Sequence, residues 1–204
     1  MQYTIGGVND AKYIAMVYLE AFPESIDMFF KQKKHSKLIE LLTNAFALVL
    51  LTGAQVLVAQ EPETQVLGYC IYSRPMFLSR RFGIILKNIG AICKHLIGCL
   101  TNINIKELAK LTHNALAMHF HTHMDHPLPK CGRINSIAVS PAAQGRGIGK
   151  ELLRRALHEL SDIPVFLSVR PNNTTAKHLY LKAGFRPIGT TSDLQGEWVL
   201  MLKD

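Results

Sequence analysis

A glycine-rich turn between a short apolar segment and an amphipathic segment is the feature that most constrains this chain. The turn reads Gln-Gly-Arg-Gly-Ile-Gly over residues 144–149. Residues 134–139 are apolar and rich in β-branched side chains, which predicts a buried strand. After the turn, apolar residues recur at helical spacing up to Leu160, which predicts a helix with one buried face. The sequence therefore predicts a strand, a glycine turn and a helix in direct succession.

A turn of this kind suits the binding of a phosphate or pyrophosphate. Glycine tolerates positive φ and leaves the backbone bare, and the first N–H groups of the following helix have no partner within the helix. These groups and the helix dipole together favour a negatively charged ligand. The alternative interpretation is a tight strand-to-helix turn whose glycines serve only packing.

Two common nucleotide-binding motifs are excluded here by single residues. The P-loop requires glycine at position 144 and serine or threonine after the lysine, where this chain has Gln144 and Glu151. The dinucleotide fingerprint, started at Gly145, requires glycine at position 150, which is occupied by Lys150. If the turn binds phosphate, it does so by a motif other than these two.

Two patterns resemble the signatures of the GNAT N-acetyltransferase superfamily. The first, Gln/Arg-x-x-Gly-x-Gly/Ala, is matched by Gln144, Gly147 and Gly149. The second, Asn-x-x-Ala-x-x-Leu-Tyr-x-x-x-Gly-Phe, is matched by Asn173, Ala176, Leu179, Tyr180, Gly184 and Phe185. The two patterns follow each other in the expected order, on predicted strand–helix units. The resemblance covers residues 134–204 strongly, residues 1–75 through element order, and residues 76–130 not at all.

The resemblance implies an α/β (α+β) fold with a mixed, splayed β-sheet flanked by helices. We expect one domain over residues 1–204. A helical insertion over residues 76–130 would separate the third and fourth strands, which most family members join by a short turn. The resemblance also implies that acetyl-CoA lies where two parallel strands part, here predicted at residues 134–139 and 164–169.

The activity that the resemblance implies is acetyl-CoA-dependent N-acetyl transfer, in which an acceptor amine attacks the thioester directly in a ternary complex. The acetyl-CoA contacts that it implies are Ile137, Ala138, Val139, Gln144, Gly145, Arg146, Gly147, Ile148, Gly149, Lys150, Asn173 and Ala176. Tyr180 would protonate the leaving thiolate, and the N–H of Val139 would stabilise the oxyanion. The acceptor is not identified, although a small amine or amino sugar is slightly favoured over a protein amine.

The general base is not evident from the sequence. Many relatives carry glutamate at two places on the fourth and fifth strands, where this chain has Arg133 and Ser168. The alternatives are Glu24, Glu40, Asp125 or a histidine of residues 119–126, acting through water. We expect Arg133 to bind an acidic group of the acceptor instead. The missing carboxylates also leave open a catalytically weak protein that binds acyl-CoA as a sensor or interaction module.

Residues 76–130 carry seven basic and two acidic residues, so most of the chain's excess positive charge lies there. Three interpretations are open: a lid or wall for an acidic acceptor, a packing or homodimer contact, and a membrane-surface helix. Membrane contact is the least favoured of the three. The apolar run over residues 82–100 is interrupted by Lys87 and Lys94, so it falls short of the roughly 18 uncharged residues that a membrane span needs.

A histidine-rich run follows within the same segment. Its period of two would place His119, His121 and His123 on one face of a strand, which is a geometry that can bind metal. No cysteine or further acid is spaced to complete a ligand set, so we expect no metal. A polar loop near the acceptor is favoured, in which one histidine could act as the base.

The composition sets the remaining bounds. The net charge of +8 suits an anionic ligand. No nucleic-acid partner is expected, because the basic span has few aromatic residues and no known binding module. The four cysteines form no C-x-x-C pair and the first residues lack a signal-peptide pattern. We therefore expect a cytoplasmic protein.

Overall fold

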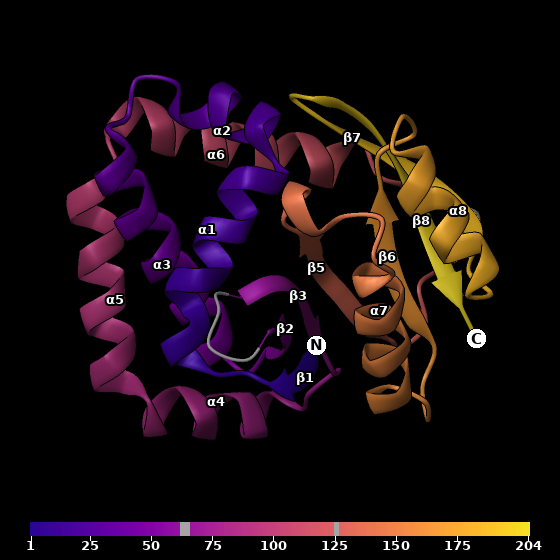
Figure 1. Ribbon diagram of the computed structural model, residues 1–204. Coiled ribbons are helices and arrows are strands. Elements are labelled where there is room, and N and C mark those ends of the chain that lie inside the picture. The colour runs from indigo at the N-terminus through magenta and orange to yellow at the C-terminus, as the bar shows by residue number, and fades with distance from the viewer. Residues whose placement is uncertain (62–65, 125–126) are drawn as a thin grey trace.

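The computed structural model describes residues 1–61, 66–124 and 127–204 (Figure 1). Its strands are β1 (Gln2–Ile5), β2 (Gln55–Gln60), β3 (Val66–Ser73), β4 (His123–Met124), β5 (Gly132–Val139), β6 (Val165–Val169), β7 (Arg186–Asp193) and β8 (Gly196–Lys203). Its helices are α1 (Ala11–Ala21), α2 (Pro23–Phe30), α3 (His35–Leu51), α4 (Leu78–Lys87), α5 (Ile89–Asn102), α6 (Ile105–Phe120), α7 (Ile148–Glu159) and α8 (Thr174–Lys182), with short 3-10 turns at Val8–Asp10 and Pro141–Ala143.

The strands form one sheet in the order β1-β2-β3-β5-β6-β8-β7-β4. Within the described residues, β5 and β6 are the one parallel pair. They pair only at Gly132 with Val165 and at Arg133 with Phe166, and then diverge. An irregularity in the pairing of β3 with β5 leaves Asn135 without a register partner. The mixed, splayed sheet expected from the sequence is therefore confirmed, and β5 begins two residues before the predicted strand.

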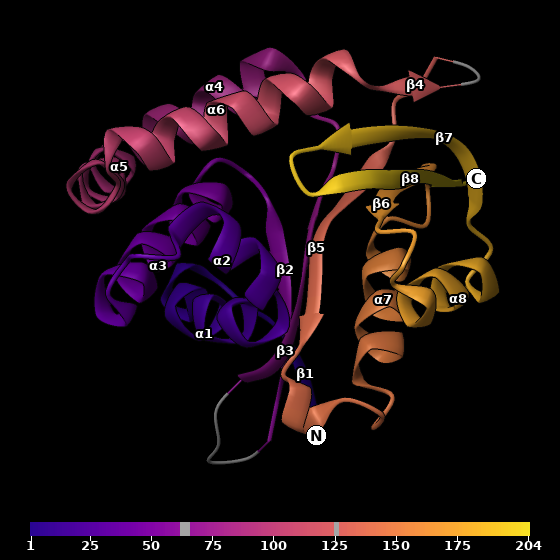
Figure 2. The same ribbon diagram turned by 90° about the horizontal axis from the view of Figure 1, so that it is seen from above.

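Helices cover both faces of the sheet (Figure 2). One face of β2 and β3 packs against α1, through residues such as Val56 and Tyr69. The alternate residues of the same strands, such as Leu57 and Cys70, pack against α7. This alternation follows from the period of two in a strand that is buried on both sides. The helix α8 lies on the α7 side of the sheet in the same view.

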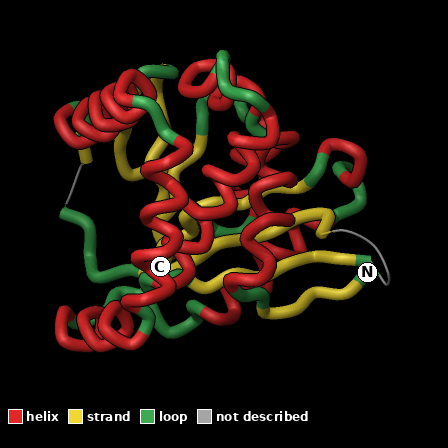
Figure 3. Tube along the Cα trace, turned by 90° about the vertical axis from the view of Figure 1, so that its left-hand side faces the viewer, coloured by secondary structure: helices red, strands yellow, loops and turns green. Residues whose placement is uncertain are grey.

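The segment between β3 and β5 is helical, as predicted, and consists of α4, α5 and α6 followed by the two-residue strand β4. The three helices frame the N-terminal half in Figure 1 and form an outer layer on one side in Figure 2. Viewed from the side of α5, helices lie in front of the strands (Figure 3). The strand β4 pairs with β7, where Gly189 is required because an added Cβ would lie 2.2 Å from the carbonyl oxygen of His123.

The structure differs from the strand alternative for the histidine run. The histidine run does not form a strand with three imidazoles on one face, because α6 continues through His119 and only His123 lies in a strand. A capping box between Asn104 and Glu107 starts α6, and its helical spacing then persists to Phe120. His126 and Asp125 lie outside the described residues. Pro23 starts α2, since proline fits the first helical position.

Candidate functional site

The divergence of β5 from β6 leaves one edge of β5 open. The N–H of Ser140 donates to the carbonyl of Leu67 on β3, at 2.8 Å. Backbone groups of successive residues in an antiparallel ladder point to alternate sides, so the N–H groups of Ile137 and Val139 face away from β3. The side-chain amide of Gln144 donates to the Val139 carbonyl at 3.3 Å, which is consistent with that direction. An extended ligand could therefore pair with this edge, alongside Ala138.

The glycine turn lies at the open end of this gap, directly before α7. Gly145 and Gly147 have φ of +78° and +77°, so each adopts the left-handed conformation that favours glycine. A Cβ added at either position would meet nothing within 4 Å, so the turn is open around its backbone. The N-cap, Gly147, has no side chain to cap the helix, which leaves the N–H groups of Ile148, Gly149 and Lys150 for a ligand.

These features fit a pyrophosphate group. Free N–H groups at the start of a twelve-residue helix attract an anion, and the exposed side chain of Lys150 adds a positive charge. Arg146 is already engaged, because its guanidinium forms an ion pair with Glu61 at the end of β2. A phosphate that used Arg146 would therefore compete with a carboxylate of the protein itself.

Asn173 occupies the second edge of the gap, at the start of α8. Its side-chain oxygen accepts a hydrogen bond from the N–H of Ala176 at 3.0 Å, so it acts as the N-cap of α8. Its amide nitrogen remains the group that could donate to a ligand. Gly184 ends the helix with φ of +91°, in the C-terminal position where glycine is favoured.

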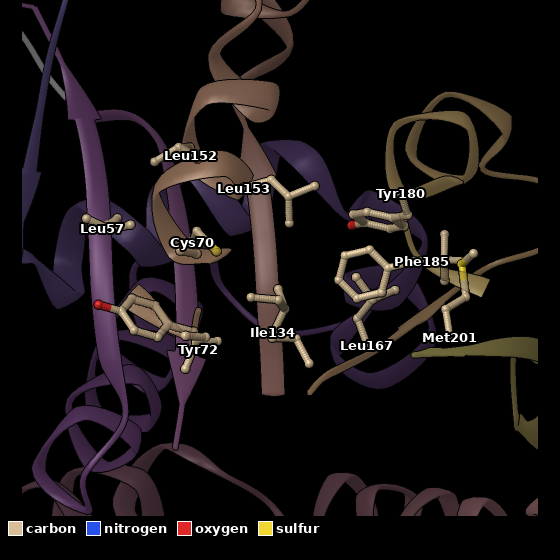
Figure 4. Packing of buried hydrophobic residues seen from close by; sticks show 14 of the residues in the cluster. Leu57, Cys70, Tyr72, Ile134, Leu152, Leu153, Leu167, Tyr180, Phe185 and Met201 are labelled. Carbon is tan, nitrogen blue, oxygen red and sulfur yellow. The ribbon is translucent and has the colours of Figure 1, made fainter. Parts of the chain in front are cut away.

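Tyr180 is buried between α8 and the sheet, at 5% exposure. Its ring contacts that of Phe185 edge-on, with the centroids 5.9 Å apart. Its hydroxyl points from α8 toward β5, on the side of Leu153 (Figure 4). Burial raises the pKa of Tyr180 well above its usual value, so the phenol keeps its proton throughout the physiological range. The group is thus a proton donor directed into the region where β5 and β6 separate.

A hollow of about 230 Å³ lies at the carboxyl end of β6, where the sheet is open. Its walls are formed by Glu24, Arg170, Pro171, Asn172, Gln195 and Glu197. The carboxylates of Glu24 and Glu197 are both on exposed residues, so the hollow offers acceptor oxygens to a cation. Among the described base candidates, Glu24 is the one that lines this hollow.

Arg170 organises the wall of the hollow, although sequence reasoning assigned it no role. Its guanidinium binds both carboxylate oxygens of Asp193, at 2.8 and 2.9 Å, and lies 3.9 Å from the ring centroid of Trp198. It also donates to the side chain of Gln195 at 2.9 Å, and Gln195 accepts from Ser25 of α2. The tip of the β7–β8 hairpin is thereby tied to β6 and α2. Two features of the sequence could have pointed to Arg170. It lies shortly before the second GNAT pattern, and the chain has a single tryptophan on which a guanidinium could stack.

Arg133 lies apart from this cluster. It begins β5 at the closed end of the gap, and its guanidinium stacks on Phe166, 4.9 Å from the ring centroid. The strand rise puts it about 13 Å from Ile137. Phe166 belongs to a cluster that does not include Tyr180, so the two predicted side chains face different surroundings. Glu40 is an exposed residue of α3, and His119 and His121 lie at the end of α6.

The described residues contain no group of three or more metal-ligating side chains that could hold an ion. A splayed α/β sheet with an anion cradle at the start of a helix is an arrangement that could hold a phosphorylated, extended ligand along an open strand edge. The chain belongs to the GNAT acetyltransferase family, because the model of the Acetyltransferase (GNAT) family matches residues 26–185.

Curated relatives are similar over a limited part of the chain. N-alpha-acetyltransferase RimI of Mycobacterium tuberculosis is 45% identical over 56 residues, which are 28% of this chain and 35% of that protein. Mycothiol acetyltransferase of Rhodococcus erythropolis is 40% identical over 60 residues, 28% of this chain and 20% of the relative. The matches thus span only about a fifth to a third of the length of these relatives.

Solved structures share the whole fold. The structure described as histone acetyltransferase HPA2 and related acetyltransferase from Corynebacterium glutamicum superposes with a TM-score of 0.63 at 19% identity, covering 99% of this chain and 94% of that one. An N-acetyltransferase from Staphylococcus aureus gives a TM-score of 0.61 at 17% identity, covering 99% and 100%. At such identities the likeness concerns the fold.

Proposed function

We propose that this protein is an acetyl-CoA-dependent N-acetyltransferase that acts on a primary amine. The observation that carries the proposal is the open edge of β5, bounded at one end by the glycine turn and faced by the buried hydroxyl of Tyr180. Family membership and the acetyltransferase names of the relatives support it. Acetyl-CoA would supply the acetyl group as a reactive thioester.

The proposed binding contacts follow from the groups that the fold leaves without partners. The N–H groups of Ile148, Gly149 and Lys150 would hold the pyrophosphate, and the edge of Ile137 and Val139 would pair with the pantetheine amides. Asn173 can contribute only as a donor, because its oxygen already caps α8. The N–H of Val139 would also donate to the carbonyl oxygen that gains negative charge during attack.

The proton transfers require one acid and one base. An amine of ordinary pKa is mostly protonated at neutral pH and must lose a proton before it attacks. We propose that Glu24 accepts that proton through water, because its carboxylate lines the hollow at the open end of β6. Tyr180 would return a proton to the departing sulfur. Arg133, far from the hollow along β5, is proposed only as an outer contact for an acidic acceptor.

We propose that the acceptor approaches the hollow through a protonated amine. The hollow carries two carboxylates that are open to solvent, while the third nearby, Asp193, is already neutralised by Arg170. A protonated amine that approaches Glu24 and Glu197 would meet complementary charge. This feature supports a small amine and an N-terminal amine equally, and turnover with a panel of acceptors would separate the two.

The test is turnover of acetyl-CoA with a panel of amino sugars, small diamines and peptide N-termini, for wild type and Tyr180→Phe. The variant keeps the ring against Phe185 and removes only the hydroxyl, so kcat should fall by about 10²–10⁴. Binding of CoA should change by no more than roughly threefold, because the phenol acts on the leaving group. Unchanged kcat would exclude Tyr180 as the acid.

Glu24→Gln, measured in the same assay with Glu40→Gln as its control, tests the base. Loss of the base should lower kcat by about 10²-fold at neutral pH, with partial recovery at alkaline pH as the amine deprotonates itself. Glu40 is exposed on α3 and does not line the hollow, so its variant should behave as wild type. Tight CoA binding without turnover of any amine would favour the acyl-CoA sensor instead.

A further inference from the structure

The outer helices α4 and α5 expose an unusual amount of large apolar side chain. Phe82 and Ile97 are each 60% exposed, and Leu78 is 83% exposed. We define the α4–α5 stripe as Leu78, Phe82, Leu86, Ile89, Ile97 and Leu100, each of which is at least 50% exposed. Isolated exposed leucines are ordinary, but a contiguous apolar surface on a folded protein marks an interaction site.

The spacing of the stripe places its members on coherent helix faces. Leu78, Phe82 and Leu86 are four residues apart on α4, so they lie one above another on the same side. Ile89 continues the series across the bend, and Ile97 and Leu100 are three residues apart on α5. The stripe is therefore an amphipathic pattern on the outside of the molecule rather than scattered apolar residues.

The opposite side of α5 is held by the protein. His95 Nδ1 lies 2.8 Å from the side-chain oxygen of Asn44 on α3, and Asn88 donates to the carbonyl of Leu51 at 3.3 Å. Among the described residues no single helix is both long and apolar enough to cross a membrane, and α4 and α5 satisfy the length and composition only together, across a bend of 79°. With its inner side attached to α3, the pair can offer only its outer side to a partner.

The charge around the stripe is positive and uncompensated. Arg80, Arg81, Lys87 and Lys94 are all exposed, and none forms an ion pair with a described residue. The sequence from 76 to 124 contains a single acid, Glu107, which is buried and paired with Lys33. A partner for this surface must therefore bring apolar area together with negative charge.

We propose that the α4–α5 stripe docks this protein on an anionic lipid bilayer, with both helices lying in the membrane interface. Apolar side chains enter the boundary between headgroups and acyl chains, and the exposed cations on the polar side of the same helices meet the lipid phosphates. The long stems of arginine and lysine let their charges reach the headgroups while the stripe is buried. The exposures thus favour the interpretation of residues 76–130 that the sequence alone favoured least.

A second copy of the chain satisfies these requirements less well. Self-association through this face would bring the same unpaired cations together without a carboxylate from residues 76–124 to oppose them, which is unfavourable. An anionic bilayer supplies the negative charge and the apolar phase at once. The two occupants make opposite predictions about vesicle binding.

The test is co-sedimentation of the full chain with vesicles of phosphatidylcholine alone and of phosphatidylcholine with about one-third phosphatidylglycerol. Wild type should bind the anionic vesicles at least tenfold more tightly, and binding should weaken when salt rises from about 0.1 M to about 0.5 M. Phe82→Ser with Ile97→Ser, and separately Arg80→Gln with Lys87→Gln, should each weaken binding about tenfold or more.

The matched control is Ile5→Ser with Leu181→Ser, two exposed apolar residues on β1 and α8, which should leave vesicle binding unchanged. Circular dichroism of every variant keeps loss of folding separate from loss of docking. Three results would overturn the proposal: no vesicle binding, equal binding of the stripe and control variants, or a dimer that the stripe variants dissociate and that ignores vesicles. Extraction of bound protein by detergent but not by salt or alkaline carbonate would overturn the interfacial placement.

Discussion

Two regions of the molecule differ in whether their large apolar side chains are buried. One is the unit formed by β5, α7, β6 and α8, and the other is the insertion formed by α4–α6. Leu152 and Leu153 of α7 are 0% and 1% exposed, whereas Phe82 and Ile97 of the insertion are each 60% exposed. The first unit covers its apolar residues with the chain's own sheet. The insertion leaves much of its apolar surface outside, which is the observation behind the proposed docking on a bilayer.

The difference extends to the polar groups. The first unit presents unpaired backbone N–H groups and one buried phenol around a gap in the sheet, an arrangement that suits one specific ligand. The insertion presents unpaired cations on the same helices as an apolar stripe, an arrangement that suits contact with an extended anionic surface. A transferase built in this way could act on an amine while it is held close to a membrane.

The insertion is nevertheless anchored by a buried ion pair, and breaking that pair should give the largest change in stability. Lys33, after α2, binds Glu107 of α6 at 2.9 Å, with side-chain exposures of 7% and 10%. Glu107→Leu leaves the ammonium group buried without a counter-charge and also removes the capping box. We expect a loss of about 3–5 kcal/mol in the free energy of unfolding, measured by urea denaturation.

The double variant Lys33→Met with Glu107→Leu serves as the internal control. Because a well-packed apolar pair avoids the desolvation of both charges, it should regain most of the lost stability. The double variant should bind anionic vesicles as tightly as wild type, since its stripe is unchanged. A single variant that is as stable as wild type would mean that the ion pair does not hold α6 in place.

The unit around the glycine turn could be predicted because its signals are local. The caps at Asn173 and Gly184 and the left-handed glycines at 145 and 147 are each specified by a few neighbouring residues. Physical requirements of this kind are visible in a sequence without knowledge of its folded neighbours. The pairing of Gly132 and Arg133 with β6 depends on a distant strand, and the predicted strand did not include these two residues.

The insertion and the hollow could not be predicted in the same way. An apolar run such as residues 82–100 has the same pattern whether its residues face a core or the outside, so exposure is decided by tertiary contacts. The strand β4 has only two residues and depends on the close approach of Gly189, about 65 positions later. The contacts that join Arg170 to Asp193 and Ser25 to Gln195 also link residues far apart in the chain.

A matched pair of leucine truncations tests the comparison most directly. Leu153→Ala in α7 opens a cavity in the main core and should cost about 3 kcal/mol of stability. Leu96→Ala in α5 removes the same atoms from a helical side chain that is 47% exposed, so its cost should stay within about 0.5 kcal/mol. Both values come from urea midpoints at constant slope.

The smaller of these two effects carries the more informative outcome. If the outer side of α5 is free in solution, Leu96→Ala leaves stability nearly unchanged at every protein concentration. If copies of the chain cover that side, the variant loses stability in proportion to the contact, and the wild-type midpoint rises with protein concentration because association is linked to folding. Leu96 adjoins Ile97 and Leu100 on the exposed side of α5, so its truncation should also weaken vesicle binding if the stripe contacts lipid. Weaker vesicle binding of Leu96→Ala, together with an unfolding midpoint that does not depend on protein concentration, would assign the surface to lipid rather than to a second copy.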